Sequence, residues 1–170
     1  MGKKKSLSCS VGLFVMIVWV WCSATPALSE TIKCKNETDM GKREVDQVLF
    51  TEYFVGSTIK EAAATCDNGE TPNVKTYSVW DATVGKENFA QGYTIYTFKD
   101  SSKIVTKFNY RQIPDPEGKA GWIWDGTAEI IKGSLRFKGI KGNVSSKSKT
   151  LHPDHRAVSE FTIPYTLPPK

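Results

Sequence analysis

The sequence has few residues of the kinds that carry nucleophilic, redox or metal-assisted catalysis. Its 170 residues include two histidines and four cysteines. No two cysteines have the Cys-x-x-Cys spacing of a thiol redox motif, and no serine or cysteine lies in a nucleophile-elbow sequence. These absences argue against thiol redox, serine-protease and cysteine-protease chemistry.

Clustered positive charge is also scarce once the amino terminus is set aside. Three of the 23 basic residues are Lys3, Lys4 and Lys5, and all 18 acidic residues follow residue 29, so residues 30–170 have a net charge of +2. A nucleic-acid-binding surface needs a clustered basic face. We therefore expect no nucleic-acid partner.

The amino terminus has the layout of an export signal. Lysines precede an apolar run from Val11 to Trp21, and small residues follow that run. The run is shorter than a membrane span, which needs about 20 apolar residues, although an uncleaved anchor is the alternative. We predict a signal peptide over residues 1–29, cleaved after Ala27-Leu28-Ser29, with Ala24 as a rival site. The chain would then be secreted or periplasmic, without stable membrane insertion.

Two cysteines, Cys34 and Cys66, follow the predicted signal peptide. An exported chain meets an oxidising environment, in which such a pair can form a disulfide bond. A bond that closes a loop of this length stabilises the fold by about 3 to 4 kcal/mol in the chain-entropy model. We predict the bond; two separate thiols are the alternative.

Turn residues interrupt the rest of the chain at short intervals, and no internal repeat occurs, which favours many strands over alternating helices. Residues 99–102 suit a hairpin turn, and residues 114–118 suit a longer loop. The predicted strands are residues 45–55, 74–84, 91–98, 103–110, 122–131, 137–146 and 156–166. The segment 58–65 is ambiguous, because its alanines also favour a helix.

Alternation within these segments separates two faces. In residues 103–110, Lys103 and Lys107 mark the solvent face. In residues 122–130, one face has Trp122 and Trp124 at one end and small residues at the other. Large residues beside small ones are what the tapering interior of a closed barrel requires. The sequence therefore predicts an all-β barrel.

Residues 130–142 have the sequence IIKGSLRFKGIKG. A phosphate-binding loop would lead into a helix, whereas the following NVSSKSK is a poor helix former. We predict a turn that closes the barrel, in which Ser134 caps one helical turn and Gly139 ends it with a positive φ. Phe137 would lie across the barrel end, and Gly142 would let the next strand leave.

This stretch resembles a turn of the small exported barrels related to allene oxide cyclase and dirigent proteins, which has the pattern G-[ST]-x-x-F-x-G-x-x-G. Residues 133–142 (GSLRFKGIKG) follow that pattern, and residues 124–129 (WDGTAE) resemble the strand before it. There are departures: Lys132 and Leu135 stand where the family often has glycine.

The resemblance implies a single, antiparallel, eight-stranded, calycin-like barrel over residues 45–170, preceded by an amino-terminal arm over residues 30–44. In the plant members the barrel cavity holds fatty-acid-derived epoxides or phenoxy radicals. The resemblance also implies a homo-oligomer, because the plant relatives form trimers. It transfers no catalytic residue to a numbered position here.

We predict that the barrel binds a small, largely apolar molecule inside or at its mouth. Aromatic side chains supply contact area, and tyrosine or tryptophan adds a hydrogen-bonding group. The alternative is that the rings simply fill the core, because an eight-stranded barrel is only just wide enough to be packed with side chains. The candidate ligand-binding residues are Tyr53, Trp80, Tyr96, Phe108, Tyr110, Trp122 and Trp124.

An isomerase or cyclase of the allene oxide cyclase or dirigent type is the alternative function. Glu129, Glu52 or Asp81 would be the general base, and Tyr96 or Tyr110 the hydrogen-bond donor. A carboxylate in an apolar site has a raised pKa, which suits proton abstraction. Alternation places Glu129 on the outer face, however, where a carboxylate is only a solvated charge. A second alternative is a non-catalytic protein that binds partners through its surface.

Both histidines lie in one short segment, His152-Pro153-Asp154-His155. Two imidazoles and a carboxylate could hold zinc or copper, but no second cluster completes a coordination set. We interpret His152, Asp154 and His155 as part of an exposed hairpin loop. No residue pattern in the sequence calls for a metal or another cofactor.

Overall fold

The structure is a computed structural model that describes residues 28–39, 42–47, 53–83, 86–115, 122–151 and 156–167. The described elements are β1 (Leu28–Asp39), β2 (Lys42–Gln47), β3 (Tyr53–Cys66), β4 (Asn73–Thr83), β5 (Asn88–Thr97), β6 (Lys103–Pro114), β7 (Trp122–Gly133), the 3-10 helix η1 (Leu135–Phe137), β8 (Asn143–Leu151) and β9 (Arg156–Leu167). Most of the predicted signal peptide, Glu52 and the histidine segment 152–155 lie outside the described residues.

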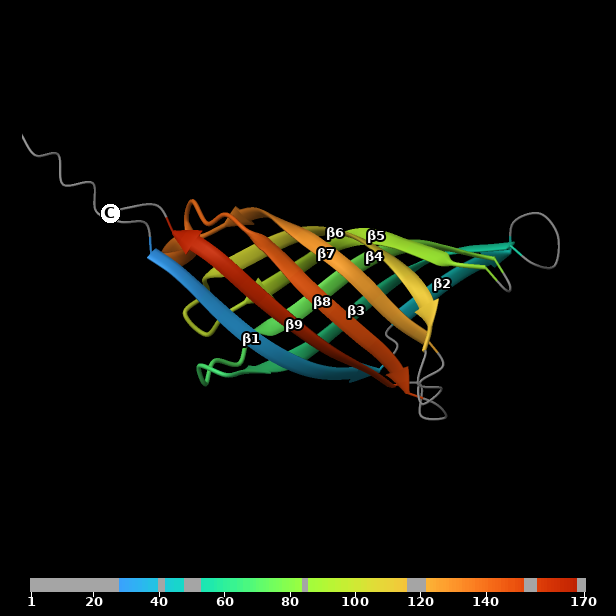
Figure 1. Cartoon of the computed structure of the whole chain (residues 1–170), viewed down its shortest axis with the longest axis horizontal. Helices are drawn as coiled ribbons and strands as arrows, with labels where there is room; N and C mark the ends of the chain where they lie inside the picture. The colour runs from blue at the N-terminus through green and yellow to red at the C-terminus, as the bar shows by residue number, and fades with distance from the viewer. Residues whose placement is uncertain are drawn as a thin grey trace, which may run out of the picture.

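The strands form one closed antiparallel barrel (Figure 1). Each strand from β3 to β8 pairs with the next strand along the chain, β9 pairs with β1, and β1 pairs with β3 to close the ring. This ring contains eight strands. The remaining strand, β2, pairs with the first half of β3, on the edge of β3 that pairs with β1 at its other end. The prediction of a single all-β, eight-stranded antiparallel barrel is confirmed.

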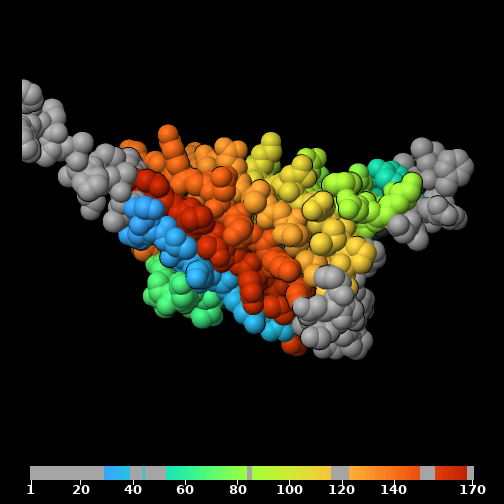
Figure 2. Space-filling view, in the orientation of Figure 1, coloured from blue at the N-terminus to red at the C-terminus, as the bar shows by residue number. Residues whose placement is uncertain are grey.

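Strand β1 lies where we expected an arm outside the barrel. It pairs with β9 along its whole length, and Figure 2 shows the two strands side by side on the near face. Sequence reasoning missed β1 because Ile32 is the only large apolar residue at its described, inward-facing positions. Strands are usually recognised by several such residues.

Other strand boundaries also differ from the predictions. Residues 45–55 are not one strand, since they include the end of β2 and the start of β3, and β8 begins at Asn143 rather than at residue 137. The ambiguous segment 58–65 belongs to β3, with Ala64 buried and Glu61 exposed. Alternating burial in the barrel wall overrides the helical propensity of its alanines.

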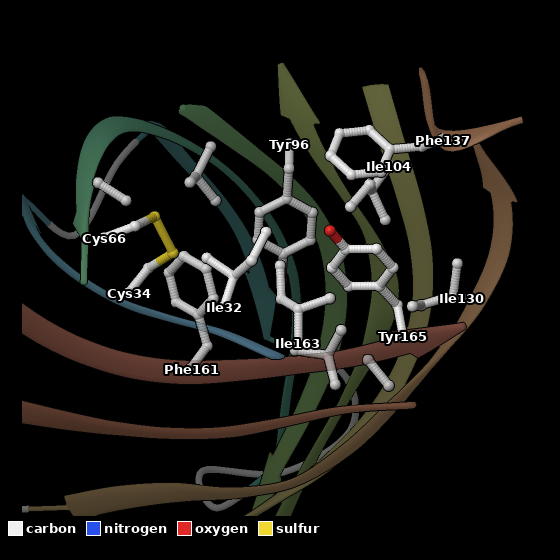
Figure 3. Close-up of a cluster of buried hydrophobic side chains, with 14 of the residues drawn as sticks. Ile32, Cys34, Cys66, Tyr96, Ile104, Ile130, Phe137, Phe161, Ile163 and Tyr165 are labelled. Carbon is white, nitrogen blue, oxygen red and sulfur yellow. A yellow bond between two sulfur atoms is a disulfide. The ribbon is translucent and has the colours of Figure 1, made fainter. Parts of the chain in front are cut away.

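A hydrophobic core fills one end of the barrel, which we call the closed end (Figure 3). The β3–β4, β5–β6 and β7–β8 connections meet there with the start of β1 and the end of β9. The predicted disulfide is confirmed, with the Cα atoms of Cys34 and Cys66 4.0 Å apart. The other buried side chains that fill this end are Ile32, Tyr96, Phe98, Ile104, Ile130, Phe137, Ile140, Val144, Phe161, Ile163 and Tyr165.

The glycine-containing turn after β7 covers the closed end. Phe137 is 2% exposed, and its ring centroid lies 4.9 Å from that of Phe98 and 5.7 Å from that of Tyr165. Gly139 has a φ of 79°, which ends η1 in a conformation that glycine adopts without a steric penalty. The structure therefore agrees with the predicted roles of Phe137 and Gly139.

Ser134 does not cap η1 with its side chain, so that prediction was wrong. The N–H of Phe137 donates instead to the backbone carbonyl of Ser134 at 3.0 Å. The Ser134 hydroxyl accepts a hydrogen bond from the N–H of Lys103 at 3.0 Å. Ser134 thus joins the closing turn to the start of β6.

Candidate functional site

The other half of the barrel, which we call the open half, contains a cavity in two adjacent compartments. The inner chamber has a volume of about 120 Å³, and the mouth compartment has a volume of about 210 Å³. Lys60, Ser78, Ala90 and Trp124 border both compartments. The interior is therefore filled with side chains at the closed end and hollow in the open half.

Aromatic rings line one part of the inner chamber. The Tyr96 and Phe161 ring centroids are 5.1 Å apart, and Phe108 stacks on Tyr110 with centroids 4.5 Å apart. Gly126 provides the space for Tyr110, because a Cβ at that position would lie 2.5 Å from the tyrosine ring. The aromatic lining thus depends on a small residue beside a large one, the pattern that indicated a barrel.

The structure brings together five of the seven predicted ligand-binding residues. Those that border the cavity are Trp80, Tyr96, Phe108, Tyr110 and Trp124. Tyr53 borders a different pocket, a groove that also involves Val55 and Phe89 from the outer face of the sheet. The side chain of Trp122 lies outside the described part of the chain.

Hydroxyl and amide groups line the rest of the inner chamber, and sequence reasoning did not propose them as ligand-binding residues. Ser148 lies opposite Ser159, and Ser159 lies opposite Asn36, across strands β8, β9 and β1. The Ser159 hydroxyl donates to the Ser148 hydroxyl at 2.9 Å. The hydroxyl oxygens of Thr76 and Thr94 are 3.2 Å apart and share a second hydrogen bond.

Asn36 brings an unpartnered polar atom to this chamber. The residue is 9% exposed, and its Oδ1 has no hydrogen-bond partner among the described residues. A buried acceptor without a donor costs about 1–3 kcal/mol, and most buried polar groups in native proteins have a partner. A donor from outside the chain would therefore bind favourably at this position.

Lys60 brings a positive charge to the cavity. It lies on the inward face of β3, between Thr58 and Ala62, and it is the only charged residue among the described residues that border the inner chamber. Thr58 accepts a hydrogen bond from the Trp80 indole nitrogen at 2.9 Å. This bond fixes the Trp80 ring at the mouth compartment, which Lys60 also borders.

Two tyrosines of the chamber hold their protons tightly. Burial, with a further contribution from Tyr110, raises the pKa of Tyr96, although a hydrogen bond with Thr106 lowers it. Burial also raises the pKa of Tyr110, against a hydrogen bond with Ser146 that lowers it. Because the usual tyrosine pKa is already about 10, both phenols are neutral at pH 7 and can donate a hydrogen bond.

The described candidate bases lie on the outer side of the wall. Glu129 is exposed, and it pairs with Lys107 on β6 and Asn143 on β8. Asp81 is half-buried, and the alternation of β4 places it on the outer face, although it borders the mouth compartment as well as the outer groove. The structure thus places no described candidate base in the inner chamber.

The described residues show neither a metal-binding cluster nor a membrane-spanning helix. No group of three or more histidine, cysteine, aspartate or glutamate side chains is arranged there to hold a metal ion. The segment with His152, Asp154 and His155 lies outside that part of the chain. Within the described ranges, no helix has the length and apolar composition needed to cross a membrane.

A solved structure has a similar fold. It is a conserved protein of unknown function, RPA1785, from Rhodopseudomonas palustris, with 6% sequence identity and a TM-score of 0.50. The match covers 84% of the present chain and 99% of the other. At this identity the similarity concerns the fold alone. No protein-family model matches the sequence, and no curated protein matches it.

Proposed function

We propose that this protein binds a small organic molecule in the open half of its barrel. The observation that carries the proposal is the contrast between the two ends, since side chains fill the closed end and leave two adjacent compartments in the open half. Ligand sites are concave, with aromatic walls and a few polar groups that fix orientation. The inner chamber has both kinds of wall.

The size of the cavity supports a small ligand. A protein cavity of about 150 Å³ is known to accommodate one benzene molecule, and the inner chamber measures about 120 Å³. The mouth compartment adds room for substituents. A purely apolar ligand would leave Asn36 and the serine hydroxyls without partners from the ligand, so an amphipathic ring compound fits the lining better.

The proposal includes export of the chain. The Cys34–Cys66 bond supports it, because disulfides persist mainly in secreted and periplasmic proteins. The similarity of the closing turn to that of allene oxide cyclase-like and dirigent-like barrels remains a proposal about ancestry, supported by the position of Phe137 over the barrel end.

The test is a titration of the exported protein with small ring compounds, namely phenol, benzoate and 4-hydroxybenzoate, followed by calorimetry and by tryptophan fluorescence. We expect saturable binding of at least one compound, with a change in emission from Trp80 and Trp124. The variant Ala90→Phe fills the space between the two compartments and should abolish binding. Ala63→Phe, on the exposed outer face of β3, is the matched control.

Two results would contradict the proposal. One is the absence of saturable binding for all three compounds. The other is equal binding to the wild type and to Ala90→Phe, with circular dichroism showing that the variant is folded, because the ligand would then lie elsewhere on the molecule.

A further inference from the structure

Most polar side chains of the inner chamber are already paired within the protein. The hydroxyl oxygens of Thr76 and Thr94 are 3.2 Å apart and share a hydrogen bond, and the Tyr110 hydroxyl is hydrogen-bonded to Ser146. Among the described residues, Asn36 Oδ1 is the one buried side-chain nitrogen or oxygen atom without a hydrogen-bond partner. The chamber therefore contains one acceptor that still needs a donor.

The strand register explains why Asn36 lacks that donor. On β3 its cross-strand neighbour is Ala64, which has no polar side chain. On β9 its neighbour is Ser159, whose hydroxyl donates to the Ser148 hydroxyl at 2.9 Å. Because a hydroxyl group has a single proton, Ser159 does not also donate to Asn36. The missing donor follows from the order of residues around the barrel wall.

Asn36, Ser159 and Ser148 form a continuous polar row on the inner face of β1, β9 and β8. Ser159 lies opposite Asn36 in one strand pair and opposite Ser148 in the other. All three residues border the inner chamber. Side chains directly opposite each other in antiparallel strands have Cβ atoms about 4.5–5.5 Å apart. A single ligand atom in front of the polar row can therefore contact more than one of its side chains.

The polar row offers a ligand both an acceptor and a donor. Asn36 Oδ1 is the acceptor. The Ser148 hydroxyl accepts the proton of Ser159, and no described residue accepts the proton of Ser148 itself. A hydroxyl group can donate one hydrogen bond and accept another. A hydroxyl on the ligand thus matches the polar row, whereas a methyl group would leave Asn36 unpaired.

Aromatic side chains provide a surface for a ring beside the polar row. Trp124 lies opposite Ser148 in the pairing of β7 with β8, and it borders the inner chamber together with Phe108 and Tyr110. A ring in contact with these side chains gains from offset or edge-to-face packing as well as from burial of apolar surface. A hydroxyl on such a ring lies in the same chamber as the polar row.

We propose that the ligand is a ring compound with a hydroxyl group, and that the polar row recognises this hydroxyl. The ligand hydroxyl donates to Asn36 Oδ1 and accepts from the Ser148 hydroxyl, while the ring packs on Trp124 and Tyr110. This inference rests on the proposed function, because it specifies the chemistry of a ligand for the same cavity.

The experiment compares three benzoates by calorimetry on the exported protein at neutral pH. At the ring position opposite the carboxylate, 4-hydroxybenzoate donates and accepts, 4-aminobenzoate mainly donates, and 4-methylbenzoate does neither while filling nearly the same volume. The carboxylate is common to all three compounds, so the differences report on that ring position. We expect 4-hydroxybenzoate to bind about tenfold more tightly than 4-methylbenzoate, with 4-aminobenzoate between them, because the methyl compound leaves Asn36 Oδ1 buried without a donor.

Variants assign the preference to the polar row. Asn36→Leu removes the acceptor, so the three compounds should bind within about twofold of one another. Ser148→Ala removes the donor to the ligand hydroxyl, so it should weaken binding of 4-hydroxybenzoate and leave that of 4-methylbenzoate unchanged. Asn109→Leu makes the same chemical change on the exposed outer face of β6, and it should preserve the wild-type order of the three affinities.

The outcomes separate this inference from the proposed function. If the wild type binds 4-methylbenzoate as tightly as 4-hydroxybenzoate, water rather than a ligand satisfies Asn36, and the hydroxyl ligand is ruled out while binding in the cavity stands. If 4-aminobenzoate binds as tightly as 4-hydroxybenzoate, the role of Ser148 is wrong, and the ligand need not be a hydroxyl compound. If none of the three binds, the proposed function itself fails. These comparisons use the wild-type protein, so they hold even if a variant does not fold.

Discussion

Cys34 and Cys66 lie directly opposite each other in the pairing of β1 with β3, and their bond joins the two strands that close the barrel. The paired part of this seam is short, running from Cys34 to Asn36 on β1 and from Ala64 to Cys66 on β3. Backbone and side-chain hydrogen bonds between Lys33 and Asp67 extend it, at 2.9 and 3.1 Å. The disulfide is the covalent part of that closure.

Removal of this bond should destabilise the barrel strongly. The double variant Cys34→Ala/Cys66→Ala should lose about 3–4 kcal/mol of unfolding free energy, because the unfolded chain regains the freedom of the closed loop. Urea unfolding followed by circular dichroism measures the loss. An unchanged midpoint in the double variant would show that the seam holds without the bond.

Phe137 should contribute more to stability than any other side chain of the closing turn. Phe137→Ala removes a buried ring that packs against Phe98 and Tyr165, and it should cost about 3–5 kcal/mol. Leu135→Ala changes a residue of the same turn that is 64% exposed, and it should change stability by less than about 0.5 kcal/mol. Thermal or urea unfolding of both variants makes the comparison. Equal losses would mean that the turn does not close the barrel through Phe137.

Alkaline pH should unfold the barrel through its buried tyrosines. Burial raises the pKa of Tyr96 and of Tyr110 in the folded state, whereas an unfolded tyrosine has a pKa of about 10. The folded state therefore keeps protons that the unfolded state releases above that pH. The stabilisation is fully present below about pH 10 and falls by up to about 1.4 kcal/mol per pH unit for each such tyrosine above it.

Urea unfolding between neutral pH and strongly alkaline pH measures this dependence. In Tyr96→Phe the fall of stability with pH should be shallower, because one of the buried tyrosines with a raised pKa is gone. Absorbance at 295 nm reports tyrosine ionisation. If it showed that all tyrosines ionise while the circular dichroism spectrum stays native, the assignment of Tyr96 and Tyr110 to the barrel interior would be contradicted.

Asn36 should lower the stability of the ligand-free protein and raise its affinity for the ligand. Asn36→Leu removes a buried oxygen that accepts no hydrogen bond from the described residues, so the unfolding free energy of the ligand-free protein should rise by about 1 kcal/mol, while the affinity for 4-hydroxybenzoate falls. Asn109→Leu, on the exposed outer face of β6, is the matched substitution and should alter neither property beyond about 0.5 kcal/mol. A large loss of stability in Asn36→Leu would show that the asparagine serves the fold instead.

The sequence was sufficient for the fold class and for much of the aromatic lining. Alternation in residues 103–110 and 122–130 placed Phe108, Tyr110 and Trp124 on the inner face, where they lie in the structure. The pair Cys34 and Cys66 could also be predicted from the expectation of export. The inner-face residues follow from the alternation within a single strand, and the disulfide follows because only two cysteines remain after the predicted signal peptide.

The polar lining could not be predicted in the same way. Serine, threonine and asparagine occur on either face of a strand, so their pattern gives no direction. Asn36 and Ser159 become neighbours only because β1 pairs with β9, far along the chain, when the ring closes. The hollow in the open half likewise follows from how the rings pack in three dimensions, and Gly126 beside Tyr110 is visible in the sequence only as a small residue.

The most direct test of the account is a crystal structure of the exported protein soaked with 4-hydroxy-3-iodobenzoate, with the iodine located by anomalous scattering. We predict one strong iodine peak inside the open half of the barrel, in contact with Phe108, Tyr110 or Trp124. A peak confined to the outer groove beside Tyr53 would contradict the claim that the cavity is a binding site. So would the absence of any iodine peak after soaking at millimolar concentration.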